Sequence, residues 1–500
     1  MDKRFLTYTI LIFLFLILYQ ALFMKPQTKN KIVKTTSTQT DTTQVEVKKA
    51  ATIEVKNPIV VKAPTFEAKF SRKGGLLVSY TLNKFHDAYG KPVELIPEGY
   101  GMFDFEAGDI KGINLNFTAD KDTFVINGNE NIVLKAKLND SLSVTKTFKF
   151  DPNIYMIDYT LAISGYEGKV LYRFDSGLRG TEKNVSEDLK NFKFIYYKDK
   201  LHKISLGKLR KSEFRAIADD FTWFGIRTRF FTFDVIHNGK FHQVVAKAHK
   251  NRISFVALSK DGPHPLKIYF GPIDYFLLKN VGYDLASIYE FGPPIINIFS
   301  KIILYSFRFL HRYIPNYGWV IVIFSLLMKV VFWPFTRYSL KSMRKMQELQ
   351  PRMKQLQKLY KNDPQRLNKE MMELYRQYKV NPFSGCLILI LQLPIFWALY
   401  QVLRTTIDLR GAPFIFWIKD LSSPDPYYIL PILMGLASLG QALTQPAQDK
   451  NARMMALFMP IFITVIFLKF PSGIVLYWFI YNIVSVIEQY MIKKSVAEGR

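Results

Sequence analysis

The sequence places one lysine inside a long apolar segment. The run from Tyr317 to Phe335 is apolar almost throughout and is long enough to cross a bilayer as a helix. Lys329 lies in the second half of this run, too deep to be a simple anchor at the membrane surface. A cation near the bilayer centre costs roughly 2.5–3.5 kcal/mol, so it is seldom kept there without a use. Two interpretations follow: a side chain that extends to the cytoplasmic headgroups, or a water-filled cavity that uses a fixed positive charge.

Other apolar segments also carry polar residues at helical spacing. Ser325 precedes Lys329 by four residues and therefore lies on the same helical face. Gln392 lies within another apolar run. The last apolar segment has a stripe at spacings of four, four and three: Tyr477, Tyr481, Ser485 and Glu488. Each of these alone is typical of contacts between membrane helices, but together with Lys329 they predict one hydrated surface.

The composition divides the chain into two parts. The mean hydropathy of +0.03 averages a polar region up to about residue 280 and long apolar runs from about residue 315 onward. The single cysteine, Cys386, excludes a disulfide framework and a thiol metal site. The net charge of +27 indicates, in a membrane protein, attraction to anionic lipid and signals of topology. The sequence has no GxxxxGK[ST] motif for a nucleotide.

Six membrane spans are expected. The apolar stretch from Phe5 to Met24 is longer than the core of a signal peptide and lacks a cleavage site, so residues 1–24 are predicted to be an uncleaved anchor. Five spans follow at about 317–335, 386–403, 428–444, 454–470 and 473–491, with a short tail at 495–500. The loop 336–385 carries twelve Lys and Arg against four Asp and Glu, which places it in the cytoplasm. The N-terminus is then cytoplasmic and the large polar domain periplasmic.

The polar region is predicted to be a flexible linker at 25–65 and a β-sandwich at 66–285. Short alternating runs such as Thr145–Phe150 are separated by turn signals, among them Asn127-Gly128, Asn238-Gly239 and Asp261-Gly262. Residues 286–316 should form an amphipathic helix on the outer membrane surface, begun by Pro293-Pro294. Its cations recur on one face: Lys301, Arg308 and Arg312.

A basic helical hairpin is expected at 336–380. Asp363 and Pro364 form a good N-cap and first residue of its second helix, and Pro351 should interrupt the first helix. Its candidate contact residues are Lys341, Arg344, Lys345, Arg352, Lys354 and Lys358. The charge could contact lipid headgroups, ribosomal RNA or a nascent chain, or could only set the topology.

A sugar-active enzyme is an alternative because some large β-sandwiches bind sugars. Six of the seven histidines lie in the sandwich region, including His237, His242 and His249. We interpret them as polar positions on half-exposed strands, because no HExxH motif, CxxC motif or compact carboxylate pair accompanies them. We therefore expect no metal, no cofactor, no small-molecule substrate and no enzymatic activity.

From about residue 318 to 494 the chain closely resembles the YidC family of bacterial membrane protein insertases. The resemblance rests on several motifs in the family's order: Asn316-Tyr-Gly-Trp, Pro334-Phe, Lys379-Val-Asn-Pro-Phe-Ser-Gly-Cys386, Gln392-Leu-Pro-Ile-Phe396, Asp420-Leu-Ser-Ser-Pro-Asp-Pro-Tyr-Tyr-Ile-Leu-Pro-Ile-Leu-Met434 and Phe470-Pro-Ser-Gly-Ile-Val-Leu-Tyr-Trp478. The segment 66–280 is similar to the large periplasmic domain of the Gram-negative members.

The resemblance implies an insertase and chaperone of the bacterial inner membrane. Its substrates would be nascent membrane proteins, which enter a hydrophilic groove open to the cytoplasm and to lipid. Its partners would be the bilayer, SecYEG with accessory Sec subunits, and the ribosome. The family has an Arg where this chain has Lys329. The implied groove residues are Lys329, Ser325, Gln392, Phe396, Met434, Tyr477, Trp478, Tyr481 and Ser485.

The predicted fold is a polytopic α-helical membrane protein with one N-terminal span, a five-helix core bundle at 317–494 that includes the cytoplasmic hairpin, and a periplasmic all-β sandwich. A secondary transporter that uses Lys329 as an intramembrane substrate or proton site is the alternative. Such a protein should show internal repeats, and none is visible in the five core spans.

Overall fold

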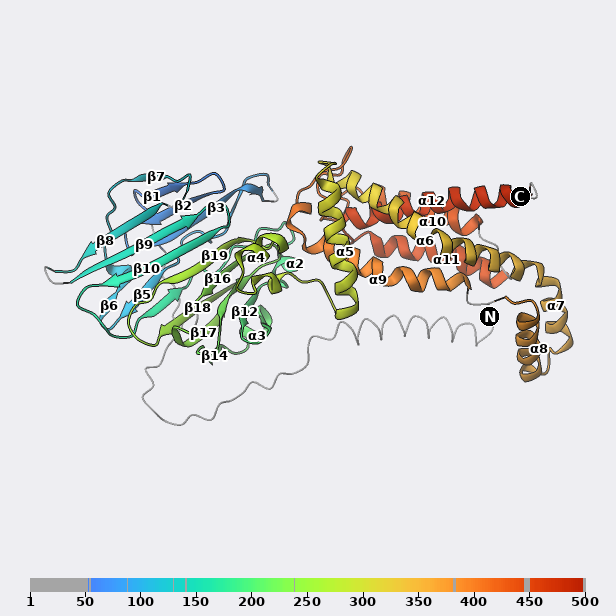
Figure 1. Cartoon of the computed structure of the whole chain (residues 1–500), viewed down its shortest axis with the longest axis horizontal. Coiled ribbons are helices and arrows are strands. Elements are labelled where there is room, and N and C mark those ends of the chain that lie inside the picture. Colours follow the sequence, from blue (N-terminus) through green and yellow to red (C-terminus); the bar gives the residue numbers. More distant parts are fainter. Residues whose placement is uncertain are drawn as a thin grey trace.

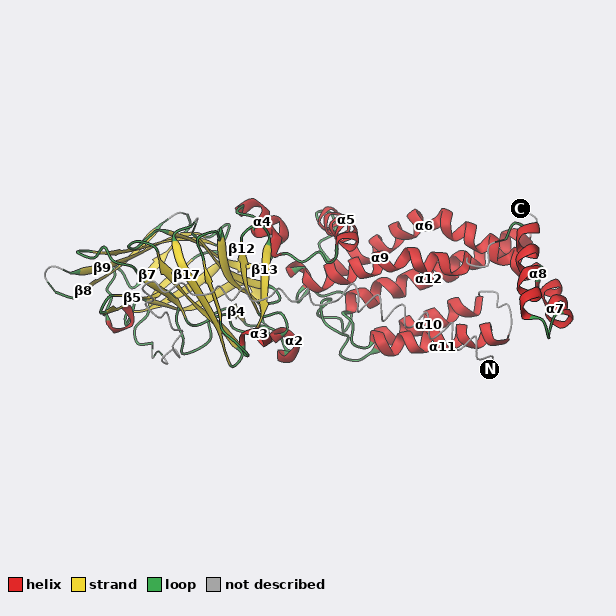
Figure 2. Ribbon diagram, turned by 90° about the horizontal axis from the view of Figure 1, so that it is seen from below, coloured by secondary structure: helices red, strands yellow, loops and turns green. Residues whose placement is uncertain are grey.

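A computed structural model describes residues 53–497 except 54, 88, 129, 140–141, 238, 381–383 and 445–449. The predicted anchor at 1–24 and most of the linker at 25–65 lie outside the described residues. A strand-rich domain and a helical bundle follow one another along the long axis of the molecule (Figure 1). Figure 2, a view turned by 90°, separates the same two regions.

The first domain consists of three sheets. The eight-stranded sheet is antiparallel and runs in the order β13 (Leu201–Ser205), β12 (Lys193–Tyr197), β15 (Trp223–Arg227), β16 (Phe231–Ile236), β19 (Leu266–Pro272), β10 (Met156–Ile163), β9 (Ser143–Asp151) and β8 (Asn131–Lys137). The six-stranded sheet runs β14 (Phe214–Ile217), β17 (Phe241–His249), β18 (Arg252–Ser259), β11 (Leu171–Phe174), β5 (Asp104–Ala107) and β6 (Ile110–Lys111). The five-stranded sheet runs β4 (Pro92–Glu94), β3 (Leu76–His86), β2 (Phe66–Ser71), β1 (Ile59–Lys62) and β7 (Thr123–Val125), with β1 and β7 parallel.

Alternation of apolar and polar residues builds this sandwich. In β8 the side chains of Ile132, Leu134 and Ala136 are buried while their neighbours face outward, which is the period of two expected for a strand with one covered face. Aromatic rings fill the space between the sheets: Phe103 contacts Phe148 at 5.3 Å between ring centroids. The predicted β-sandwich class is confirmed.

One histidine departs from the interpretation made from the sequence. His237 is buried between Phe224 and Phe241, with ring centroids 5.0 and 5.1 Å away. The expectation of a half-exposed strand position was wrong for this residue, although His242 is exposed and His249 is half-buried. Burial lowers the pKa of His237 to about 3, because the imidazolium would lose its hydration, so the ring is neutral.

Short helices accompany the sandwich: α2 (Val185–Leu189), α3 (Leu206–Leu209) and α4 (Tyr275–Val281), with single 3-10 turns η1 (Gly112–Asn114) and η2 (Leu285–Ile288). The bundle consists of α6 (Tyr317–Glu348), α9 (Ser384–Thr405), α10 (Ile429–Thr444), α11 (Lys450–Phe467) and α12 (Ser472–Ala497). Within the described residues, two helical segments are long and apolar enough to cross a membrane, Tyr317–Glu348 and Ser472–Met491. Ile429–Thr444 and Arg453–Phe467 are shorter apolar helices.

Helix α5 (Pro294–His311) lies across the end of the bundle, roughly perpendicular to the long helices (Figure 1). It begins at Pro294, as predicted, since proline is well suited to the first helical position. Its buried side packs on α9 and α6. Its opposite side exposes an apolar stripe: Ile295, Ile298, Ile302, Tyr305 and Phe309.

At the other end of the bundle, α7 (Gln350–Leu359) and α8 (Pro364–Gln377) form the hairpin (Figure 2). Helix α6 continues through Pro334 to Glu348, so the span and the first arm of the expected hairpin are one helix. The interruption predicted from Pro351 is confirmed, and it falls at Leu349. The Asp363 cap is also confirmed, because its Oδ1 accepts from the Arg366 N–H at 3.0 Å.

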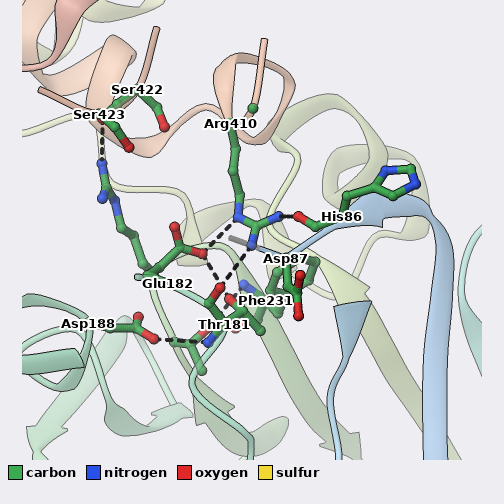
Figure 3. A network of polar contacts seen from close by, with 12 residues as sticks. His86, Asp87, Thr181, Glu182, Asp188, Phe231, Arg410, Ser422 and Ser423 are labelled. Carbon is green, nitrogen blue, oxygen red and sulfur yellow. Dashed lines mark hydrogen bonds and ion pairs between the residues drawn. The ribbon is translucent and has the colours of Figure 1, made fainter. Parts of the chain in front are cut away.

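The side chains of Arg410 and Arg229 join the sandwich to the end of α9 and to the loop that follows it; Figure 3 shows the contacts of Arg410. The guanidinium of Arg410 donates to the Glu182 carboxylate at 2.7 Å and to the carbonyl oxygens of Thr181 and His86. Arg229 of the sandwich donates to the carbonyl oxygen of Arg404 at 3.1 Å. These charge-assisted bonds fix the sandwich to the outer end of the bundle.

Candidate functional site

Lys329 forms a buried ion pair with an acidic residue of another helix. Its Nζ donates to Glu488 Oε2 at 2.9 Å, and the two side chains are only 6% and 3% exposed. The ammonium also lies 4.1 Å from the ring centroid of Tyr481, within the range of a cation–π contact. Lys329 is therefore neither an unpaired cation nor an exposed side chain that reaches the headgroups.

Packing of α6 against α12 brings the pair together. Tyr481 and Glu488 are seven residues apart, which is two helical turns, so both face α6. Glu488 belongs to the stripe predicted on the last span, but sequence reasoning did not assign it to Lys329. A signal was present: Glu488 is the single acidic residue of the segment 473–491, and intramembrane charges pair with one another.

Two buried serines lie on the same two helices. Ser325 donates to the carbonyl oxygen of Ile321 at 2.7 Å, and Ser485 donates to the carbonyl oxygen of Tyr481 at 2.7 Å. Each hydroxyl is thus satisfied by its own helix, a common arrangement for serine in apolar helices. Both oxygens can still accept a hydrogen bond from a further donor.

Three buried polar atoms of the bundle helices have no well-aligned hydrogen bond among the described residues: Gln392 Nε2, the Tyr477 hydroxyl and Glu488 Oε1; the Gln392 and Tyr477 side chains lie close to each other. They come from α9 and α12, which pack against each other. Buried polar atoms are nearly always hydrogen-bonded, so such a group suggests a surface that meets polar ligands. The interior of the bundle therefore has unused hydrogen-bonding capacity around the ion pair.

Other predicted groove residues lie in an aromatic cluster between α9, α11 and α12. Phe396 contacts Trp478 edge-on at 5.3 Å and Phe467 at 5.8 Å between centroids. Met434 is fully buried on α10, which packs against α11 and α12. The nine predicted residues thus fall into three groups: Phe396 and Trp478 in the aromatic cluster, Gln392 and Met434 on α9 and α10, and the remaining five on α6 and α12, namely Lys329, Ser325, Tyr477, Tyr481 and Ser485.

The basic residues predicted on the hairpin are at its surface. Three of them belong to the last turns of α6, where Lys341 and Lys345 are exposed and Arg344 is half-buried. The other three are exposed on α7: Arg352, Lys354 and Lys358. Met346 and Met353 are buried between the helices with Leu374, whereas Met372 is 51% exposed. The hairpin thus has a packed inner side and a cationic outer side, on the end of the bundle opposite the sandwich (Figure 1).

The exterior of the bundle is apolar. Exposed side chains include Val330 on α6, Leu436 on α10, Ile461 on α11 and Ile487 on α12. Exposed apolar side chains on four helices of one bundle are typical of helices in lipid. No group of three His, Cys, Asp or Glu side chains suited to a metal ion occurs in the part of the chain that the structure describes. The class is thus a polytopic membrane protein with a polar ion pair inside its bundle and a β-sandwich outside it.

Comparison with known proteins identifies the family to which the chain is similar. Residues 309–499 match the family model described as 60Kd inner membrane protein, and residues 58–306 match the YidC periplasmic domain. The chain is 32% identical over 480 residues to the membrane protein insertase YidC of Syntrophus aciditrophicus, covering 88% of this chain and 86% of the relative. It is also 32% identical over 535 residues to that of Geobacter sulfurreducens, covering 99% of each.

A crystal structure of an active YidC insertase with its first transmembrane domain resolved covers 88% of this chain and 93% of its own, with 19% identity and a TM-score of 0.42. On the sequence matches, the chain belongs to the YidC family of membrane protein insertases. It is an inner-membrane protein with a periplasmic domain, and it acts in the insertion of membrane proteins. The transporter alternative is not favoured.

Proposed function

We propose that this insertase receives hydrophilic segments of nascent inner-membrane proteins at the Lys329–Glu488 pair. The observation that carries the proposal is that the partner of Lys329 is a side chain of a different helix, 2.9 Å away. An acidic group of an entering segment can replace Glu488 on the ammonium. Such an exchange keeps one ion pair on Lys329 but leaves Glu488 unpaired, so water or donors of the entering segment must hydrogen-bond to Glu488 for the net cost to be small. No covalent chemistry is needed.

The pair suits passage better than a lone cation would. An unpaired buried charge costs several kcal/mol. A lone cation would bind an acidic segment with a free energy of about the same size. With Glu488 present, the site binds an acidic group weakly and can release it. The ring of Tyr481, whose centroid lies 4.1 Å from the ammonium nitrogen, can keep its cation–π contact while the carboxylate partner changes.

Neighbouring groups would receive the rest of the segment. The neighbouring side chains of Gln392 and Tyr477 can turn from each other to satisfy backbone amides that would otherwise be desolvated. The apolar helix of the substrate would leave along exposed apolar side chains of α6 and α12, such as Val330 and Ile487. Its burial in lipid supplies the driving force.

The partners and the orientation belong to the same proposal. The N-terminus and the cationic hairpin would face the cytoplasm, where the exposed lysines and arginines can contact a nascent chain or, transiently, ribosomal RNA. The sandwich would lie in the periplasm and dock SecYEG and its accessory subunits. Helix α5 would lie in the plane of the outer membrane surface, as its exposed apolar stripe suggests.

Reconstitution tests the proposal. The full chain in proteoliposomes should insert a small coat-like protein with an acidic hydrophilic segment, as measured by protease protection. The K329Q/E488Q variant, which removes both charges and keeps a polar side chain at each position, should slow this insertion while leaving a substrate with a neutral segment unaffected. If both substrates insert equally well with either protein, the ion pair has no role in receiving the segment.

A further inference from the structure

A second polar site lies at the junction of α4, α5 and α6. It is a cavity of about 450 Å³, which we call the α5 pocket. Its wall combines charges of both signs with aromatic surface: Asp274, Phe276, Arg308, His311, Arg312 and Asp408. The ion pair at Lys329 does not involve any of these residues.

The cations of the α5 pocket lie at the end of α5. Arg308 and Arg312 are one helical turn apart and both are exposed. The guanidinium carbon of Arg308 lies 3.8 Å from the centroid of the Phe276 ring, which holds it over the cavity. His311 stacks on the Tyr317 ring at 3.9 Å, and its buried Nδ1 has no hydrogen-bond partner among the described residues.

The opposite side of the α5 pocket is acidic. Asp408 accepts a hydrogen bond from the Tyr317 hydroxyl at 3.2 Å. Burial raises the pKa of Asp408, and the charge of Asp274 raises it further, so these two carboxylates lie close enough to repel each other. A cation between them would relieve that repulsion. The cavity therefore presents an anion site and a cation site side by side.

The surroundings of the α5 pocket indicate a lipid. The apolar stripe of α5, which includes Ile302, Tyr305 and Phe309, is exposed beside the arginines. Helices of this kind lie in the interface of a bilayer, with their cations at the level of the phosphates. Figure 1 shows α5 lying across the bundle, so its axis runs along the membrane surface when the bundle spans the bilayer. Acyl chains could then follow the stripe while the headgroup enters the cavity.

We propose that the α5 pocket binds the zwitterionic headgroup of an aminophospholipid from the outer leaflet. Arg308 and Arg312 bind the phosphate, and the His311 ring donates or accepts one further hydrogen bond. Asp274 and Asp408 bind the primary ammonium. A choline headgroup carries no N–H donors for these carboxylates, and a glycerol headgroup carries no positive charge, so both should bind more weakly.

Native mass spectrometry of the delipidated full-length protein tests this proposal, with dioleoyl phosphatidylethanolamine, phosphatidylcholine and phosphatidylglycerol added separately. The wild type should bind the ethanolamine lipid most tightly.

The variants test the two halves of the site. R308Q/R312Q should weaken that binding about tenfold or more, because two charge-assisted contacts are lost. D274N/D408N should abolish the preference for ethanolamine over choline. The variant should keep the fold, because an asparagine side chain at position 274 can still cap α4 and one at position 408 can still accept the hydrogen bond of the Tyr317 hydroxyl. K301Q is the matched control, because it removes one cation from α5 outside the pocket.

The proposal is overturned by any of three results. R308Q/R312Q could retain the ethanolamine lipid as well as K301Q does. The wild type could prefer phosphatidylglycerol, which would make the site an anion site only. Soluble phosphoethanolamine could bind as tightly as the lipid does, which would identify a free metabolite as the ligand. Because lipid binding is measured without any insertion, failure here leaves the proposed role of Lys329 untouched.

Discussion

The two domains each bury a lysine, and they satisfy it in different ways. Lys146, on β9 of the sandwich, is fully buried and donates to the carbonyl oxygens of Gly74, Gly75 and Phe103 at 2.7, 3.3 and 2.6 Å. Lys329, in the bundle, has one carboxylate and one ring face. All three donors of Lys146 are bound to backbone, which cannot rotate away.

The comparison teaches that burial alone does not identify a functional lysine. Lys146 joins the Gly74-Gly75 turn to the strand region at Phe103, so its role is to hold the sandwich together. Lys329 is held by a side chain that can change its rotamer, and the second oxygen of that carboxylate has no partner among the described residues. The exchangeable partner marks the bundle lysine as the one suited to transient binding.

The largest effect should follow from K146M. Methionine has a similar shape but leaves three buried carbonyl oxygens without donors, at about 1–3 kcal/mol each. We expect the sandwich to lose at least about 3 kcal/mol of stability. Pulse proteolysis of the full chain in urea measures this loss, and cleavage of the sandwich unchanged from wild type would contradict the structural role of Lys146.

The next-largest effect should be the loss of bundle stability when Lys329 is removed and Glu488 is left unpaired. K329A leaves Glu488 as a buried unpaired charge, which should destabilise the bundle by about 3–5 kcal/mol. K329Q/E488Q should recover most of that loss, since it removes both charges together. Thermal inactivation in detergent, followed by size-exclusion chromatography, compares the two. Equal loss in both variants would mean that the ion pair is not what stabilises this contact.

Exchange of lysine for arginine should separate the two sites. K146R introduces a larger planar group into a closed cradle and should destabilise the sandwich by about 1–3 kcal/mol. K329R should keep the bundle stable and insertion within about twofold of wild type, because a guanidinium also pairs with a carboxylate. The same thermal and insertion assays apply, and a damaging K329R would show that the site requires lysine geometry.

The smallest effect is a pH dependence confined to the sandwich. Burial lowers the pKa of Lys146 to about 7, although nearby Asp104 opposes this shift. Above pH 7 the unfolded chain binds more protons than the folded one at this residue, so stability should rise with pH, by up to about 1.4 kcal/mol per unit. Urea unfolding of the wild type and K146M between pH 7 and 9 tests this, since the contribution should vanish in K146M.

The sequence predicted those features that depend on neighbouring residues. The cap at Asp363 and the start of α5 at Pro294 are local, and the structure confirms both. Lys146 could also have been found, because Val144, Lys146 and Phe148 share one strand face by the period of two. Because Lys146 shares this face with two apolar residues, the pattern predicts that its side chain is buried and not solvated.

The features that the sequence did not predict depend on contacts between distant segments. Glu488 lies 159 residues from Lys329, and no single sequence determines which apolar helices pack together. The continuation of α6 beyond Pro334 was missed for another reason. The expected span ended at Phe335, where the apolar pattern ends, but the helix continues through Pro334 into the basic segment. The α5 pocket likewise needs four separate segments.

A double-mutant cycle on insertion rate tests the central claim most directly. One change is K329Q/E488Q in the insertase, and the other is Asp→Asn at a single acid in the hydrophilic segment of the substrate. We predict that the substrate change slows insertion by wild type but has no effect with the variant, a coupling of about 1–3 kcal/mol. The contradicting result is that the substrate change slows insertion by the same factor with both proteins. That acid would then not contact the buried pair directly.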